Sequence, residues 1–365
     1  MPDITIAKAA LDKLIKDARA HLYRPIQIAE ILYRNRMSPD TINLLNLDNY
    51  RTQSNKWRDD MCQILVGRKS NSSANYHKDL FSTLMPPEKL KILGDENIKT
   101  NGAVEAYVYS RFVKKRSQLA SALDYCLTAN KENFDVAKLI NSFTTEAGLK
   151  RSIDKIYEII VYALFSTLVS ALELKIELSI NQSKGPLLFE FADFAKMVMC
   201  LDTGMLRRGD ICGYNVKNTQ NAKVFRVGVT NAADRGLDMY SNWGPAIQIK
   251  HLSLNEELAE GIVEGVSSDK IVIVCKEAEE RFIISLLNQI GWRNRIQSIV
   301  TEKNLIDWYE KALRGNYAEM IGDELLNCLC SEISNEFPSL EETPEILKGR
   351  GYDEIHDEFW NALQE

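Results

Sequence analysis

The chain has 365 residues, 45% of them hydrophobic, and a formal net charge of -6. That size allows two domains with a sizeable core, and the negative charge argues against a protein that coats nucleic acid without regard to sequence. The longest apolar run, Ile159 to Leu172, is shorter than the roughly 20 residues that a spanning helix needs, and no signal-peptide pattern opens the chain. We therefore expect a cytoplasmic protein that does not enter a membrane.

The cysteines are expected to be reduced thiols. Seven are present, and none forms a Cys-x-x-Cys pair or has a histidine at the spacing of a zinc site. No zinc centre is predicted from them.

The first half of the chain is expected to be helical throughout, because its apolar residues recur at helical spacing. Pro25 sets a break near the start of the second helix, and Gly67 is a stop signal after the third. The predicted helices span 5–20, Leu22 to Tyr33, Ser54 to Val66, Gly102 to Ala129 and Glu146 to Ile180.

Basic side chains gather on two of these helices and are the candidates for contact with a phosphate backbone. A solvated basic face is the alternative interpretation, and charge alone cannot read a base sequence. The predicted DNA-binding residues are Arg111, Lys114, Lys115 and Arg116 on the long helix that starts at Gly102, and Lys56 and Arg58 on an earlier helix.

The polar stretch Asn181 to Pro186, which ends in Gly-Pro, is the strongest loop signal in the chain. We place a domain boundary there, because helices alone give way to strands that alternate with helices. The prediction is a helical N-terminal domain over 1–183, for DNA binding and dimerisation, then a catalytic α/β domain over 184–337 and an acidic C-terminal tail over 338–365.

The predicted order after the boundary is helix, three strands, helix, strand, helix, strand, followed by two helices. Such alternation indicates an α/β architecture with a mixed central sheet. A capping box at Ser253–Glu256 predicts that a helix begins directly after the third strand. The elements are helix Leu187 to Leu201, strand Val224 to Thr230, a hairpin ending at His251, a helix to about Val266, strand Lys270 to Cys275, helix Ala278 to Ile290, strand Ile296 to Val300, and helices Leu305 to Arg314 and Tyr317 to Ile333.

A β-hairpin is expected between Asp238 and His251, with its turn at Asn242 to Pro245. Alternation along the second strand places Gln248 and Lys250 on one face. Asp238 lies across the hairpin from them, so a carboxylate, an amide and an ammonium group are predicted to converge.

These three groups suit the hydrolysis of a phosphodiester. Asp238 is the predicted ligand of a divalent cation, Gln248 supports the metal or a water molecule, and the main-chain carbonyl of Ile249 is a further candidate ligand. Lys250 polarises the attacking water or stabilises the charge on the scissile phosphate.

A second acid is expected to complete the metal site, because a neutral amide is a weaker Mg²⁺ ligand than a carboxylate. Glu190 is the first candidate and Asp234 the second. The alternative interpretation is that Glu190 is an ordinary exposed acid on a helix.

His251 should point to the opposite strand face as a hydrogen-bonded core histidine. Trp243 packs on the hairpin or touches the minor groove, and Arg207 and Arg208 contact phosphates or are solvated.

The segment Asp238 to Leu254 resembles the motif region of the HaeII-like type II restriction endonucleases. An Asp followed ten residues later by Gln-x-Lys also resembles the PD-(D/E)xK nucleases, with Gln in place of the second acid. Further segments match in order along most of the chain, namely His21–Tyr33, Tyr50–Arg51, Lys56–Asp59, Ile271–Lys276, Leu286–Trp292 and Trp308–Gly315.

The resemblance implies a type II restriction endonuclease that hydrolyses double-stranded DNA at a short specific site with Mg²⁺. It implies a PD-(D/E)xK-like core behind an all-α N-terminal region, a homodimer that matches a palindromic site, and a cognate DNA methyltransferase as genetic partner. Two alternatives stay open: a catalytically weak or inactive DNA-binding protein on a nuclease-like fold, which the neutral Gln248 allows, and a nonspecific or repair nuclease.

Overall fold

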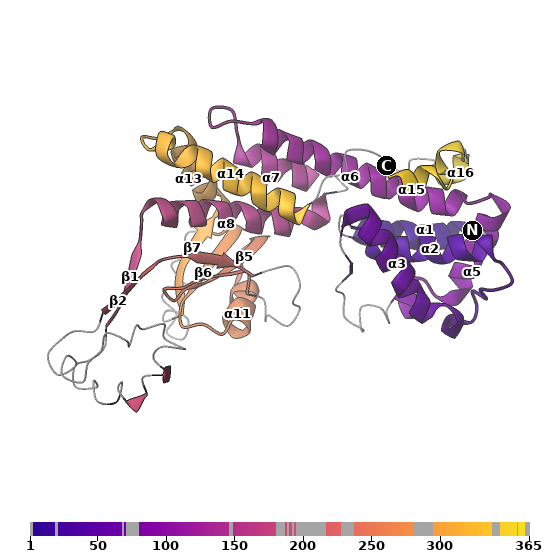
Figure 1. Cartoon of the computed structure of the whole chain (residues 1–365), viewed down its shortest axis with the longest axis horizontal. Coiled ribbons are helices and arrows are strands. Elements are labelled where there is room, and N and C mark those ends of the chain that lie inside the picture. The colour runs from indigo at the N-terminus through magenta and orange to yellow at the C-terminus, as the bar shows by residue number, and fades with distance from the viewer. Residues whose placement is uncertain are drawn as a thin grey trace. The chain divides into compact units, whose positions relative to one another are not determined.

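The computed structural model (Figure 1) divides into two compact units. The first unit comprises Met1–Ile160, Ile306–Ala318 and Leu326–Glu365, and the second comprises Val161–Leu305 and Glu319–Leu325. The residues that the structure describes are 3–18, 21–67, 69–70, 80–145, 149–179, 187, 190–191, 193–194, 217–227, 237–279, 295–337, 344–355 and 357–361.

The described N-terminal part of the first unit is helical, as predicted. Gly67 ends the third helix in the left-handed conformation, at φ 67°, and its N–H bonds to the carbonyl of Gln63. The helices are α1 (Asp3–Asp17), α2 (Tyr23–Met37), α3 (Arg51–Val66), α5 (Pro87–Lys99), α6 (Ala103–Thr128) and α7 (Val136–Thr145), with short 3₁₀ turns at Leu47–Asn49 and Lys150–Ser152 and a π turn at Leu80–Leu84.

A buried network of polar side chains crosses the core of the first unit. Arg350 donates to both carboxylate oxygens of Glu30, at 2.5 and 3.1 Å, and Arg36 donates to both oxygens of Glu105, at 2.9 and 3.0 Å. The Tyr352 hydroxyl donates to Glu105 at 2.8 Å, and burial raises the pKa of this phenol, so it keeps its proton. Each buried carboxylate therefore has a cation and a hydroxyl or amide partner.

The C-terminal segment contributes to this same core. It holds two short helices, α15 (Glu345–Lys348) and α16 (Glu358–Asn361), and buries Leu347 and Trp360 in the hydrophobic cluster of the N-terminal helices. The described part of the predicted acidic tail therefore contributes buried residues to the core of the first unit. The predicted boundaries at 183 and 337 adjoin residues outside the described ranges and stay predictions.

The second unit is built on a mixed sheet, as predicted. Its five strands lie in the order β3-β4-β5-β6-β7. The first three strands pair antiparallel and the last three parallel. Their bounds are β3 (Val224–Arg226), β4 (Met239–Ser241), β5 (Ala246–Ser253), β6 (Ile271–Glu277) and β7 (Ile296–Thr301).

Helix α11 (Glu256–Gly265) makes the crossover between the parallel strands β5 and β6. Its N-cap is Asn255, whose side chain accepts a hydrogen bond from the Leu258 N–H at 2.9 Å, so a helix follows the motif strand as predicted but starts two residues later than the capping box at Ser253 indicated. Figure 1 shows α11 on one side of the sheet. Ala259, Ile262 and Val263 of the helix pack on that face in one hydrophobic cluster.

The predicted helix over Glu146 to Ile180 is wrong at its C-terminal end. Helix α8 covers Ile153–Ala171, Glu173 takes a left-handed backbone at φ 47°, and Lys175–Ser179 is a strand, β1. The strand pairs antiparallel with β2 (Lys217–Asn221), a partner distant in the chain that helical periodicity could not reveal.

The last two long helices agree with the prediction and carry residues of both units. They are α13 (Glu302–Arg314) and α14 (Ala318–Glu336). The predicted helices Leu187 to Leu201 and Ala278 to Ile290 fall largely outside the described residues. Among the described residues, the chain forms no helix with the length and apolarity needed to span a bilayer.

Replacing Arg350 by Ala should destabilise the first unit, because the change leaves the buried Glu30 carboxylate without its cation. The expected loss is about 3–5 kcal/mol in the free energy of unfolding, measured by urea denaturation with circular dichroism. Lys348→Ala removes an exposed charge from the same segment and should change the free energy by less than about 0.5 kcal/mol. Equal effects of the two substitutions would contradict this account of the C-terminal segment.

Candidate active site

The predicted hairpin is present and is formed by β4, a tight turn and β5. Met239 faces Ile247 across the ladder, and the Ser241 N–H donates to the Pro245 carbonyl at 3.0 Å. Gly244 in the turn has φ 130°, a backbone angle that favours glycine. The Val227 N–H donates to the main-chain oxygen of Asp238 at 2.9 Å, which fixes the residue just before β4.

The hairpin brings together Asp238, Gln248 and Lys250. Oδ2 of Asp238 accepts hydrogen bonds from Gln248 Nε2 at 2.5 Å and from the Ile249 N–H at 2.7 Å. Lys250 Nζ lies 3.9 Å from the same oxygen, the length of a loose ion pair. Acid, amide and ammonium thus converge as the strand alternation predicted.

The three side chains differ in exposure in a way that suits a reaction at the surface. Gln248 is buried, with an exposed fraction of 2%, while the Lys250 side chain is 37% exposed and that of Asp238 is 13% exposed. The ammonium group can therefore reach a ligand in solution, and the amide beneath it is held by the core.

The oxygen atoms around this site fit a hard divalent cation. Oε1 of Gln248 is buried and has no hydrogen-bond partner, a costly arrangement that a ligand cation would relieve. The Ile249 N–H points to Asp238, and in a strand the carbonyl of a residue lies on the same edge as its N–H. The main-chain carbonyl of Ile249 therefore points to the side of β5 where Asp238 lies, and carboxylate, amide and main-chain oxygens are the ligands that Mg²⁺ prefers.

The second acid that the sequence suggested is not identified. Glu190 is exposed, and no hydrogen bond or ion pair joins it to Asp238 or Lys250. Asp234, Arg207 and Arg208 lie outside the described residues. Within the described ranges, no group of three or more His, Cys, Asp or Glu side chains is placed to hold a metal ion.

His251 has the structural role that the sequence indicated. Its side chain is 7% exposed, and Nε2 lies 3.1 Å from Oε2 of Glu302 at the start of α13. The strand alternation points it away from Lys250, so it supports the sheet from the opposite face. Trp243 in the hairpin turn is 37% exposed.

Asn242 organises the hairpin turn in a way that the sequence analysis missed. Its side-chain oxygen accepts from the Lys223 N–H at 2.8 Å, and its Nδ2 donates to the Asn221 carbonyl at 3.0 Å. An Asn in a turn favours such side-chain to main-chain bonds, but the partners lie about twenty residues away and leave no local signal.

Several of the basic residues predicted to grip DNA are buried inside the first unit. Lys115 donates to the Ile15 and Ala18 carbonyls at the end of α1, at 2.7 and 3.0 Å. Arg58 bonds to Asp59 at 2.9 Å and to Gln27 at 3.2 Å. These two side chains are occupied within the fold and do not present their charge to a phosphate.

The other predicted DNA-binding residues differ in their exposure to solvent and in their partners. Lys56 and Lys114 are exposed, and the Arg111 guanidinium lies 4.9 Å from the centre of the Tyr107 ring. Arg116 is 2% exposed, its three guanidinium nitrogens have no hydrogen-bond partner, and burial lowers its pKa to about 10.

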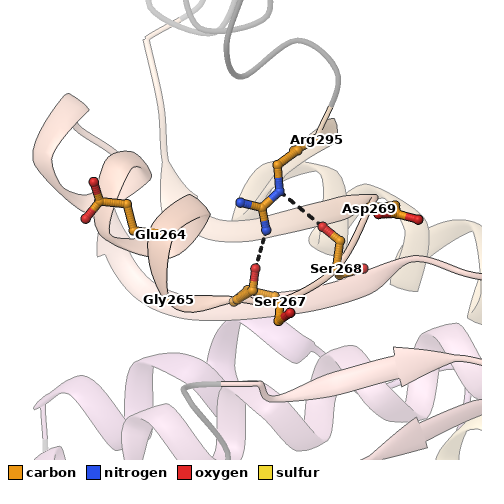
Figure 2. Close-up of a pocket in the computed structure, with 7 residues that line it drawn as sticks. Glu264, Gly265, Ser267, Ser268, Asp269 and Arg295 are labelled. Atoms are coloured by element: carbon orange, nitrogen blue, oxygen red, sulfur yellow. Dashed lines mark hydrogen bonds between the residues drawn. The ribbon is translucent and has the colours of Figure 1, made fainter.

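A separate pocket lies at the connection between α11 and β6 (Figure 2). Glu264 and Asp269 line it, and Arg295 donates to the Ser268 carbonyl at 3.1 Å and to the Val263 carbonyl at 2.5 Å. The guanidinium therefore fastens the start of β7 to the end of α11. This pocket contains none of the three converging hairpin residues.

An acid just before one strand, with an amide and a lysine on the adjacent antiparallel strand of a mixed sheet, is consistent with a nuclease-like core. A model of the HaeII restriction endonuclease family matches residues 7–352. The chain belongs to this family and is a type II restriction endonuclease, a site-specific deoxyribonuclease.

Two relatives match along nearly the whole chain. The type II restriction enzyme HaeII of Haemophilus aegyptius is 54% identical over 340 residues, which cover 93% of this chain and 94% of the relative. The type II restriction enzyme NgoBI of Neisseria gonorrhoeae is 50% identical over 351 residues, covering 95% and 96%. No solved structure matches the chain.

Replacing Arg116 by Met should stabilise the protein, because the unpaired guanidinium pays for burial without a partner and Met fills a similar volume. The expected gain is about 1–4 kcal/mol in the free energy of unfolding. Lys114→Met removes the same charge from an exposed position of α6 and should change the free energy by less than about 0.5 kcal/mol. A loss of stability in Arg116→Met alone would show that the guanidinium has a favourable partner.

Proposed function

We propose that this restriction endonuclease hydrolyses phosphodiester bonds in double-stranded DNA at the hairpin site, with Mg²⁺ as its cofactor. The observation that carries the proposal is the convergence of Gln248 and Lys250 on Oδ2 of Asp238. Family membership sets the reaction class, and the geometry supports these residues as the ones that carry it out.

The cation would be held by Asp238, by Oε1 of Gln248 and by the carbonyl of Ile249. When bound, Mg²⁺ would lower the pKa of the attacking water and offset the charge that develops on the phosphate. Glu190 and Asp234 stay candidates for a further carboxylate ligand, since a site with one acid binds Mg²⁺ weakly.

Lys250 would act on the scissile phosphate. Its ammonium is partly exposed and lies 3.9 Å from Asp238, so the ion pair between them is loose. Such a pair contributes little to stability and leaves the charge available to a substrate oxygen. A fixed positive charge beside the phosphate stabilises the transition state more than the ground state, which is what accelerates hydrolysis.

Gln248 would orient the carboxylate of Asp238. Its Nε2 donates to Oδ2, so the carboxylate is held in one rotamer, with its other oxygen directed away from this bond. Because the amide is 2% exposed, the surrounding core prevents it from moving with solvent. The amide replaces the acid usual in this class of site and removes the repulsion between two adjacent carboxylates.

Lys56, Arg111 and Lys114 are proposed as contacts to the DNA backbone, because they are the members of the predicted basic group that are not fully buried. Contacts of this kind strengthen binding to any sequence and make it sensitive to salt.

The cleaved site is proposed to be palindromic and the enzyme a homodimer, because a two-fold axis in the protein matches one in the DNA. A cognate DNA methyltransferase is proposed as genetic partner, since unprotected host DNA would otherwise be cut. We expect the enzyme in the cytoplasm, because it acts on unprotected DNA inside the cell.

The purified protein should cut plasmid and phage DNA into discrete fragments in the presence of Mg²⁺, and EDTA should stop the cleavage. Lys250→Ala and Asp238→Asn should each lower the cleavage rate at least about 100-fold while DNA binding persists. Lys276→Ala changes an exposed lysine on the neighbouring strand β6 and should cleave at the wild-type rate. Normal cleavage by Lys250→Ala would place the reaction elsewhere.

Replacing Arg111 and Lys114 together by Gln should weaken binding to all DNA sequences alike. The slope of log affinity against log salt concentration should fall by about 0.9 for each lost phosphate contact, as measured by fluorescence anisotropy in Ca²⁺. Lys91 and Lys99 of α5, whose side chains are 43% and 77% exposed, replaced together by Gln, remove the same charge and serve as the matched control. An unchanged slope would remove α6 from the DNA-binding surface.

A further inference from the structure

The strands β1 and β2 form a two-stranded antiparallel ribbon in the second unit. Lys175 pairs with Asn221 and Glu177 with Thr219, while Ile176 pairs with Gln220 on the alternate positions. Figure 1 shows the ribbon extending from the end of α8, apart from the five-stranded sheet. The sequence of β2, Lys-Asn-Thr-Gln-Asn, contains no apolar residue, which is unusual for a strand.

One face of the ribbon presents polar side chains to solvent. Lys175, Glu177, Thr219 and Asn221 share this face and are all exposed. Lys175 Nζ donates to the side-chain oxygen of Asn221 at 2.5 Å, so two of them are already ordered toward one another. Among the described residues, no third strand pairs with the ribbon. An isolated two-stranded ribbon is marginally stable in water, which favours a partner for this face.

The ribbon is fastened to the catalytic hairpin at one end. Asn242 in the hairpin turn donates to the carbonyl of Asn221, accepts from the N–H of Lys223 and donates its own N–H to the Lys223 carbonyl. The Ala222 N–H bonds to the Leu174 carbonyl at 2.8 Å and closes the ribbon at the same end. A single turn therefore links the ribbon to the hairpin that begins just after Asp238.

The link also limits the distance between the ribbon and Asp238. Val227 is hydrogen-bonded to Asp238, and Asn221 precedes it by six residues. A strand rises about 3.4 Å per residue, so Asn221 lies within about 20 Å of Val227, the residue whose N–H bonds to Asp238. That length corresponds to about six base-pair steps of DNA, the scale of a short cleavage site.

We propose that the exposed face of the β1–β2 ribbon reads base edges in the major groove of the DNA that the enzyme cuts. The major groove, about 12 Å wide, admits a two-stranded ribbon. Asn pairs with adenine, Lys with guanine and Glu with cytosine, and Thr contacts several bases, so the four side chains are of the types that discriminate bases. The proposal rests on the proposed function, because it assigns the DNA substrate to this face.

The charge of this face supports base reading over a grip on phosphates. Lys175 and Glu177 carry opposite charges, so the face adds no net positive charge to attract a backbone. Its continuity with the hairpin through Asn242 favours the substrate of the hairpin as its occupant. Association with a second copy of the chain is the competing outcome, and it would leave the base preference of the ribbon variants unchanged.

The test is to sequence the ends of fragments cut from a randomised DNA library by the full-length protein and its variants. Asn221→Ala should lower cleavage of the wild-type site roughly 10- to 100-fold and relax the base preference at one position of each half-site. Thr219→Val is a second variant, in case Asn221→Ala does not fold. Gln220→Ala, on the opposite ribbon face, should keep the wild-type preference.

Three results would contradict the ribbon proposal or the proposed function. An unchanged base preference in folded Asn221→Ala and Thr219→Val would overturn the ribbon proposal. An unchanged preference together with loss of the dimer in sedimentation would do the same and assign the ribbon to contact between copies. Failure of the wild-type protein itself to cut any library member would contradict the proposed function, which separates that failure from a change seen only in the variants.

Discussion

One carboxylate oxygen, Oδ2 of Asp238, sets the geometry of the whole site. It receives hydrogen bonds from Gln248 Nε2 and from the Ile249 N–H, and the Lys250 ammonium lies beside it. These contacts exist only because the pairing of Met239 with Ile247 sets the register of the hairpin. A slip of one residue would turn Gln248 and Lys250 to the other face, so the register is the constraint on which the proposed site depends.

The rest of the second unit keeps this hairpin in place. Helix α11 packs on the face of the sheet that carries Ala246, and the pair of His251 and Glu302 supports the other face. Asn242 ties the hairpin turn to the end of β2. In the first unit, the buried ion pairs of Glu30 and Glu105 play the comparable part, because they hold distant segments of the chain in one core.

The sequence was sufficient to predict structure where the signal is local. Alternation along β5 predicted the convergence of Gln248 and Lys250, and helical periodicity predicted α6 closely. Strand β1 was missed because its pairing partner, Asn221 opposite Lys175, is distant in the chain. The burial of Arg58 and Lys115 could not be foreseen either, because their partners belong to other helices. A basic residue gives the same sequence pattern whether its helix face is exposed or packed.

Calorimetric titration with Ca²⁺, in the presence of duplex DNA that contains the cleavage site, tests the central claim most directly. Ca²⁺ takes the same oxygen ligands as Mg²⁺, so the titration reports occupancy of the metal site. The account predicts that the wild-type protein binds the cation and that Asp238→Asn loses this binding while it still binds the DNA. Equal Ca²⁺ affinity in the two proteins would contradict the assignment of the metal site to the hairpin.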